Sequence, residues 1–145
     1  MDTLAKNSTE NKMLKKLSKP NSVIVVPSGK DFFKWWCVFL RPFVSLTNRE
    51  IDIVANLLEQ RYKLSKVISD PAVLDSQLMS QNTINKVLED CNITIQHLYV
   101  VMSNLRKKKV ITDTGIDPRL IPTFRKDDNG LFQLLILFKG LSLDN

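Results

Sequence analysis

Apolar side chains recur three and four residues apart between Thr94 and Lys108, and this spacing constrains the fold more than any other feature of the chain. The residues that share it are Ile95, Leu98, Met102 and Leu105. Because an α-helix has 3.6 residues per turn, these residues fall on one side of a helix, which must be buried against other elements. Thr94 is a suitable N-cap, since its hydroxyl can accept a hydrogen bond from a free backbone amide. The stretch therefore predicts an amphipathic helix that packs on a core.

A second helix is expected immediately before it, over residues 81–90. Ser80 stands at the N-cap position, and Asn92 supplies a turn between the two helices. The apolar residues at helical spacing are Ile84, Val87 and Leu88. Two helices joined by so short a turn are expected to brace one another.

Further helical segments are expected upstream. Residues 46–62 open with Thr47 and, three positions later, Glu50, which is the capping-box pattern. Apolar residues then recur at helical spacing, so this segment also predicts a helix. Residues 63–79 are broken by Pro71 and should form short helical pieces.

An aromatic-rich segment, residues 30–40, should form a helix that ends before Pro42. Its aromatic side chains cover more than one face, whereas a core helix needs a single apolar stripe. Part of the cluster is therefore a candidate docking surface, and the alternative is that the helix wraps a small core. The candidate docking residues are Phe32, Phe33, Trp35 and Trp36.

Short β-prone runs dominate the chain after the last helix, with turn residues between them. The runs are 110–115, 119–124 and 131–138, and the turns are 113–115 and 127–130. Asn129-Gly130 between apolar runs is a good hairpin signal. We therefore expect a C-terminal β-hairpin. Near the other end of the chain, residues 22–29 predict a strand or an extended segment.

Composition and charge set the class of protein. The chain has 145 residues, of which 43% are hydrophobic and 25% charged, as in one globular domain with an additional arm. We expect a basic arm at 1–21, the domain at 22–140 and a tail at 141–145. The arm lysines are Lys6, Lys12, Lys15, Lys16 and Lys19. The net charge of +6 favours an anionic partner, either nucleic acid or an acidic protein surface.

Cysteine usage and hydropathy indicate a protein that stays inside a cell. Cys37 and Cys91 both lie in apolar helical stretches, and we expect buried free thiols. No apolar run approaches the roughly 20 residues that cross a bilayer, so no membrane partner is expected. The polar N-terminus carries no secretion signal, so we expect that the protein is not secreted.

Helices followed by a β-ribbon is the order of elements in a winged helix-turn-helix domain, and three short motifs resemble members of that class. "LRKKKVI" at 105–111 is similar to the helix end and first wing strand of MarR-type winged helices. "LTNREIDIV" at 46–54 is similar to the opening of LuxR-type domains, and "GIDPRLIP" at 115–122 resembles the wing of RepL-type replication initiators. The expected fold class is therefore α+β and mainly helical, a winged helix-turn-helix with a C-terminal β-hairpin wing and an N-terminal arm.

The chain as a whole, from the aromatic segment to "GIDPRLIP", also resembles a winged-helix family of crAss-like tailed phages, whose genes accompany those of virion proteins. The resemblance implies a structural protein of the virion in or near the head–tail connector. Its partners would be protein subunits of a larger assembly, in a homo-oligomer or ring. Its location would be the virion or the host cytoplasm.

The outer face of the helix at 94–108 is the candidate site for binding DNA or a protein partner. Gln96 and Asn104 carry the amides that pair with adenine, and Ser103 and the basic residues could contact phosphate. The face residues are Gln96, His97, Tyr99, Val100, Ser103 and Asn104, and the basic end holds Arg106, Lys107, Lys108 and Lys109. The basic end has an alternative interpretation as a solvated helix terminus, where cations complement the helix dipole.

The middle of this outer face is apolar. Tyr99 and Val100 lie there, with Val101 beside them. Leaving these side chains open to water forgoes burial worth roughly 25 cal/mol per Å². The face therefore suits a protein contact better than base reading, although both alternatives stay open.

No residue pattern suggests catalysis. The chain has one histidine, four scattered glycines without a phosphate-binding loop, and no cysteine–histidine cluster with metal spacing. We therefore expect that the protein is not an enzyme and has no cofactor or metal. The alternative to a virion role is a sequence-specific DNA-binding transcription regulator or replication initiator.

Overall fold

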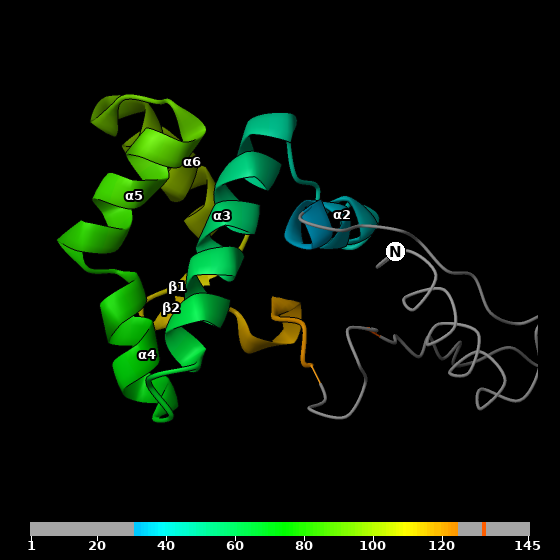
Figure 1. Cartoon of the computed structure of the whole chain (residues 1–145). Helices are drawn as coiled ribbons and strands as arrows, with labels where there is room; N and C mark the ends of the chain where they lie inside the picture. The colour runs from blue at the N-terminus through cyan, green and yellow to red at the C-terminus, as the bar shows by residue number, and fades with distance from the viewer. Residues whose placement is uncertain (1–30, 125–131, 133–145) are drawn as a thin grey trace, which may run out of the picture. The chain divides into compact units, whose positions relative to one another are not determined.

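The computed structural model describes residues 31–124 and Phe132. The described part is mainly helical, with one small antiparallel hairpin, so the expected α+β class is confirmed at this level (Figure 1). The chain divides into two compact units, Pro27–Pro122 and Met1–Val26 with Thr123–Asn145, and every element named below belongs to the first. The arm at 1–21, the run at 22–29, the turn at 127–130 and the tail at 141–145 lie outside the described residues, as does the run at 131–138 apart from Phe132.

Helix α3, Asn48–Ser65, is the central element and packs against α2, α4, α5 and α6. It begins at the predicted capping box, in which the Glu50 amide donates to Thr47 Oγ1 at 3.2 Å and the Thr47 amide donates to Glu50 Oε1 at 2.8 Å. Two free amides are thereby satisfied at the helix start. The helix runs three residues past the predicted end at Tyr62.

Helix α2, Phe32–Phe39, is the predicted aromatic helix and ends before Pro42 as expected. Trp36 and Cys37 are its buried residues. The Trp36 indole N–H donates to the carbonyl of Leu120 at 2.8 Å, which ties the helix to the end of the described chain.

Helices α4, Pro71–Leu78, and α5, Gln81–Cys91, follow α3. Pro71 occupies the first turn of α4, where its missing N–H costs nothing, and Asp70 caps the helix by accepting from the Ala72 amide at 3.0 Å. Ser80 stands at the N-cap of α5, but its side chain makes no capping bond there, so that part of the prediction is wrong. Its hydroxyl lies 3.5 Å from Thr83 Oγ1 instead.

Helix α6 spans Ile95–Lys107, and the turn that joins α5 to it is a Schellman motif. Asn92 adopts a left-handed backbone with φ 51°, and the Ile93 amide donates to the Leu88 carbonyl at 3.2 Å. Thr94 then caps α6, as predicted, by accepting from the His97 amide at 3.2 Å.

The chain leaves α6 through a hairpin of two short strands, β1, Ile111–Thr112, and β2, Gly115–Ile116. Ile111 faces Ile116, and Thr112 faces Gly115. The predicted strand at 119–124 is wrong, because a 3₁₀ turn, Pro118–Leu120, occupies its start. Asp117 caps this turn by accepting from the Arg119 amide at 3.0 Å, so the Asp-Pro pair specifies a turn there.

The core is built around α3 and receives side chains from every other helix. Its best-buried large residues are Ile53, Val54, Leu58, Leu78, Val87, Leu105 and Val110. Cys37 and Cys91 are free thiols, as expected, but only Cys37 is fully buried, whereas Cys91 is half-buried. Burial raises the pKa of Cys37 to about 12. In the part of the chain that the structure describes, no helix is both long and apolar enough to cross a membrane.

Candidate interaction surfaces

The outer face of α6 carries an exposed apolar pair, Tyr99 and Val100, which we call the tyrosine patch. Their side chains are 61% and 59% exposed. The polar candidates Gln96, His97, Ser103 and Asn104 are exposed around them. Val101, which was expected beside the patch, is only 5% exposed, because it lies on the inner side of the helix with Leu98 and Leu105.

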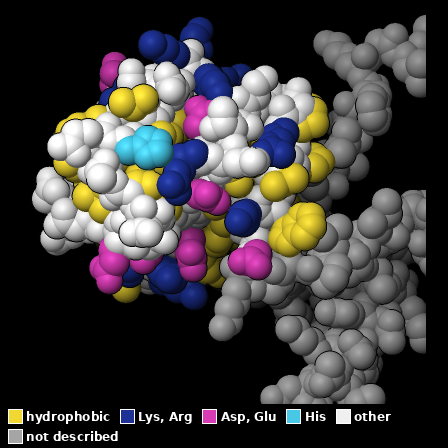
Figure 2. All heavy atoms as spheres, turned by 90° about the horizontal axis from the view of Figure 1, so that it is seen from above, with side chains coloured by type: hydrophobic (Ala, Val, Ile, Leu, Met, Phe, Trp, Pro, Cys, Tyr) yellow, Lys and Arg dark blue, Asp and Glu magenta, His cyan; other side chains and the backbone are white. Residues whose placement is uncertain are grey.

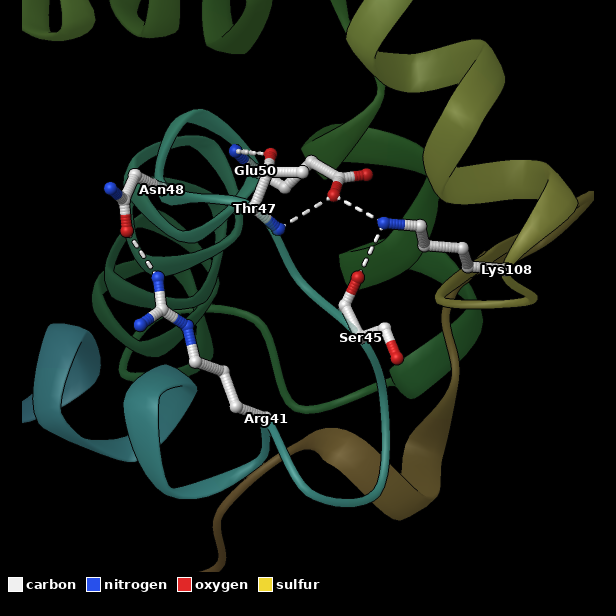
Figure 3. Close-up of polar contacts among 6 residues, drawn as sticks. All are labelled: Arg41, Ser45, Thr47, Asn48, Glu50 and Lys108. Carbon is white, nitrogen blue, oxygen red and sulfur yellow. Dashed lines mark hydrogen bonds and ion pairs between the residues drawn. The ribbon is translucent and has the colours of Figure 1, made fainter.

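The basic end of this face divides into two roles. Arg106, Lys107 and Lys109 are exposed and make no ion pair or side-chain hydrogen bond with another described residue. Lys108 differs, because its ammonium lies 2.5 Å from Glu50 Oε1 and also donates to the Ser45 carbonyl (Figure 3). The predicted basic site therefore has three cations that face water and a fourth, Lys108, that is held by contacts with its own domain.

Glu50, which is 3% exposed, joins the start of α3 to the end of α6. Burial alone would raise the pKa of this carboxyl. The hydrogen bonds from Lys108 and Thr47, together with the ammonium charge, instead hold the pKa below its ordinary value of 4.5. Its second oxygen, Oε2, has no hydrogen-bond partner among the described residues. One carboxylate thus caps α3 and anchors the basic end of α6, as Figure 3 shows.

Lys109 is held in an unusual backbone conformation at the end of α6. Its φ is 62°, in the left-handed region that favours glycine. The Val110 amide donates to the Leu105 carbonyl at 2.9 Å and the Lys109 amide to the Arg106 carbonyl at 3.0 Å, so a second Schellman motif closes this helix. A lysine at this position costs folding free energy relative to glycine.

Helix α2 and the residues after it expose a second apolar surface, the aromatic patch, formed by Trp35, Val38, Phe39 and Phe43. Phe43 is 70% and Trp35 51% exposed, and the rings of Phe39 and Phe43 lie 5.8 Å apart. Of the four predicted docking residues, only Trp35 is more than half exposed. Trp36 is 9% exposed and serves the core, while Phe32 and Phe33 are half-buried. Phe39, which lies in the predicted aromatic helix, and Phe43, which follows it, were not among the predicted docking residues.

An open groove of about 410 Å³ lies between α2, α3 and α5 and was not foreseen. Its acidic lining residues are Asp31, Asp52, Glu59 and Asp90, with Lys34 among them and the side chains of Phe33 and Ala55 adding apolar surface. Lys34 lies 3.5 Å from Asp52, and Asn56 donates to Asp90 at 3.0 Å. We call this the acidic groove. Figure 2 shows acidic side chains interspersed with basic and hydrophobic ones on the face seen from above.

No three His, Cys, Asp or Glu side chains within the described residues come together in an arrangement that could hold a metal ion. The expectation that the protein is not an enzyme and has no cofactor stays a prediction.

No protein-family model, curated protein or solved structure matches the chain. Its function must therefore be inferred from the geometry and charge of its own surfaces.

Proposed function

We propose that the protein is a non-enzymatic assembly component of a tailed-phage virion, built on a winged helix-turn-helix domain and placed in or near the head–tail connector. In this proposal its apolar surfaces bind neighbouring protein subunits, and it forms a homo-oligomer or ring. The phage context comes from the resemblance of the chain to a winged-helix family of crAss-like phages.

The order of the elements supports the winged-helix part of the proposal. Helix α3 is followed by α4 and then by the closely joined pair α5 and α6, and the hairpin of β1 and β2 leaves the end of α6, where a wing would lie. The hairpin has only two residues in each strand, which is short for a wing. The turn at Asn92 and the cap at Thr94 fix the geometry of the pair.

The observation that carries the assembly role is the presence of two exposed apolar surfaces on separate elements. The tyrosine patch lies on α6, and the aromatic patch lies on α2 and the turn after it. Contiguous exposed apolar groups of this kind mark protein contacts, since aromatic residues are enriched in the centres of interfaces. The tyrosine patch also occupies the middle of the face that a DNA-reading helix would turn toward bases, where such helices usually carry short polar side chains.

A second candidate function is a DNA-binding regulator or replication initiator. It is favoured by the three exposed cations at the end of α6, Arg106, Lys107 and Lys109, which have no acidic partner among the described residues. Such cations contribute to salt-dependent phosphate binding. Gln96 and Asn104 are exposed on the same helix and would read adenine.

Mass spectrometry of purified phage particles tests the assembly role. We expect the protein in the particles, and we expect it to bind virion proteins when purified. A stable monomer that neither enters particles nor binds virion proteins would refute the proposal.

A titration against duplex DNA across a salt series tests the second candidate. A site-specific complex that survives competitor DNA and weakens on Gln96→Ala would favour the regulator. Binding that is indifferent to sequence and vanishes with salt would not.

A further inference from the structure

The acidic groove and the outer face of α6 have opposite charges and a similar layout. The groove combines carboxylates with apolar surface from Phe33 and Ala55. The α6 face combines the tyrosine patch with Arg106 and Lys107 about two turns further along. Tyr99 and Arg106 are seven residues apart, as are Val100 and Lys107, so each pair shares one side of the helix. Each surface therefore offers an apolar part with charge beside it, and the two charges attract.

One copy of the chain cannot bring these two surfaces together. Lys108 holds the basic end of α6 against Glu50, at the start of α3. Asp52, which lines the groove, is two residues further along α3 and so lies about 200° around the helix axis from Glu50. The groove and the basic end consequently face opposite sides of α3, and only another molecule can fill the groove with such a surface.

We propose that the acidic groove receives the basic end of α6 from a second copy of this chain. The contact rests on the proposed assembly function and specifies how its subunits join. Where each copy uses its two surfaces on different neighbours, the contact is heterologous, and repetition closes into a ring or continues as a filament; two copies that exchange the contact reciprocally form a two-fold dimer. Lys108 acts as a positioning residue, since it fixes the direction in which Arg106 and Lys107 project.

A charge-swap experiment tests this contact. In one variant, Arg106→Glu and Lys107→Glu reverse the basic end, and in another, Glu59→Lys and Asp90→Lys reverse the groove. Circular dichroism and urea unfolding first verify that both variants fold. Light scattering should show association of the unaltered chain that weakens as salt is raised, and loss of association in each variant alone.

Mixing the two variants is the decisive step, because each reversed surface then meets a complementary one. Association should return in the mixture. The control variant, Lys66→Glu with Lys86→Glu, makes the same change in net charge as the basic-end variant. Its exposed lysines lie after α3 and on α5, so it should leave association intact.

Three results would overturn the contact. The first is an unaltered chain that stays monomeric up to its solubility limit. The second is association that neither reversal affects, which leaves the wider assembly role standing on other surfaces. The third is a mixture that stays monomeric while a lysine-rich peptide from residues 1–21 binds the basic-end variant, which keeps the acidic groove, and does not bind the groove variant; this would assign the groove to the arm.

Discussion

Replacing Lys108 by methionine should destabilise the domain although the lysine looks like one of four equivalent surface cations. Methionine keeps the apolar stem but removes the ammonium that contacts Glu50 Oε1 and the Ser45 carbonyl. The Glu50 side chain is 4% exposed, and its Oε2 has no hydrogen-bond partner among the described residues, so the variant leaves a buried carboxylate whose remaining hydrogen bond comes from the Thr47 amide.

The size of the effect follows from the burial of the two partners. Removing one partner of a fully buried ion pair costs about 3–5 kcal/mol. The Lys108 side chain is 31% exposed, so water already screens the pair, and we expect a loss of about 2 kcal/mol. For a domain of this size that corresponds to a fall in Tm of roughly 8–16 °C.

Urea unfolding measures this loss directly, with Lys107→Met as the matched control. Lys107 is exposed and has no described partner, so its replacement should change stability by less than about 0.5 kcal/mol. Adding Glu50→Gln to the Lys108→Met variant should recover part of the loss, because it removes the unpaired charge. Equal midpoints for the Lys108 and Lys107 variants would refute the reasoning.

The same pair predicts a pH dependence. The pKa of Glu50 is lower in the folded chain than its ordinary value of 4.5, so its contribution to stability is present above that pH. The contribution is lost as the pH falls through the folded-state pKa. The Lys108→Met variant should lose less stability than the unaltered chain over this acidic range. Parallel stability curves below pH 4.5 would contradict this.

Three further predictions concern single positions. Lys109→Gly should stabilise the domain by about 0.5–1 kcal/mol, because glycine adopts the left-handed backbone of this position without strain. Lys107→Gly, within α6, should destabilise the domain by a similar amount. Urea unfolding distinguishes the two signs. Gly115→Ala should lower the free energy of unfolding by more than about 1 kcal/mol, because φ is +145° and the new Cβ would lie 3.2 Å from Asp75 Cγ. The control Asp113→Ala, in the same hairpin, should change it by less than about 0.5 kcal/mol. Tyr99→Ser should weaken self-association, measured by light scattering, with little loss of stability. The control Val73→Ser, at another exposed apolar site, should leave association unchanged. Equal effects of the two changes would show that the tyrosine patch is not part of the interface.

Local signals in the sequence were enough to place the helices. The capping box at Thr47 and Glu50, the turn at Asn92 and the cap at Thr94 each act within a few residues, so the sequence displays both partners. The strand expected at 119–124 was wrong because a local turn signal just before it was given less weight than the apolar residues of the run. The Asp117-Pro118 pair specifies a turn, and its local preference prevailed over the apolar residues after it.

The surfaces could be predicted only in part. Exposure of Tyr99 and Val100 followed from helical periodicity, but the inward place of Val101 depended on how wide the buried side of α6 would be. The bond between Lys108 and Glu50 joins residues 58 positions apart, and the acidic groove collects residues from three helices. Tertiary packing creates such arrangements, and no spacing within one segment of the sequence displays them.

The bond between Trp36 and Leu120 joins two points of the chain that are 84 residues apart, close to where the described chain begins and ends. Tension between the two flanking segments in an assembly would therefore act across this indole contact and across the packing of α2 on α3. The paired helices α5 and α6 lie outside that mechanical path, so their outer face would keep its shape while the flanking segments were pulled.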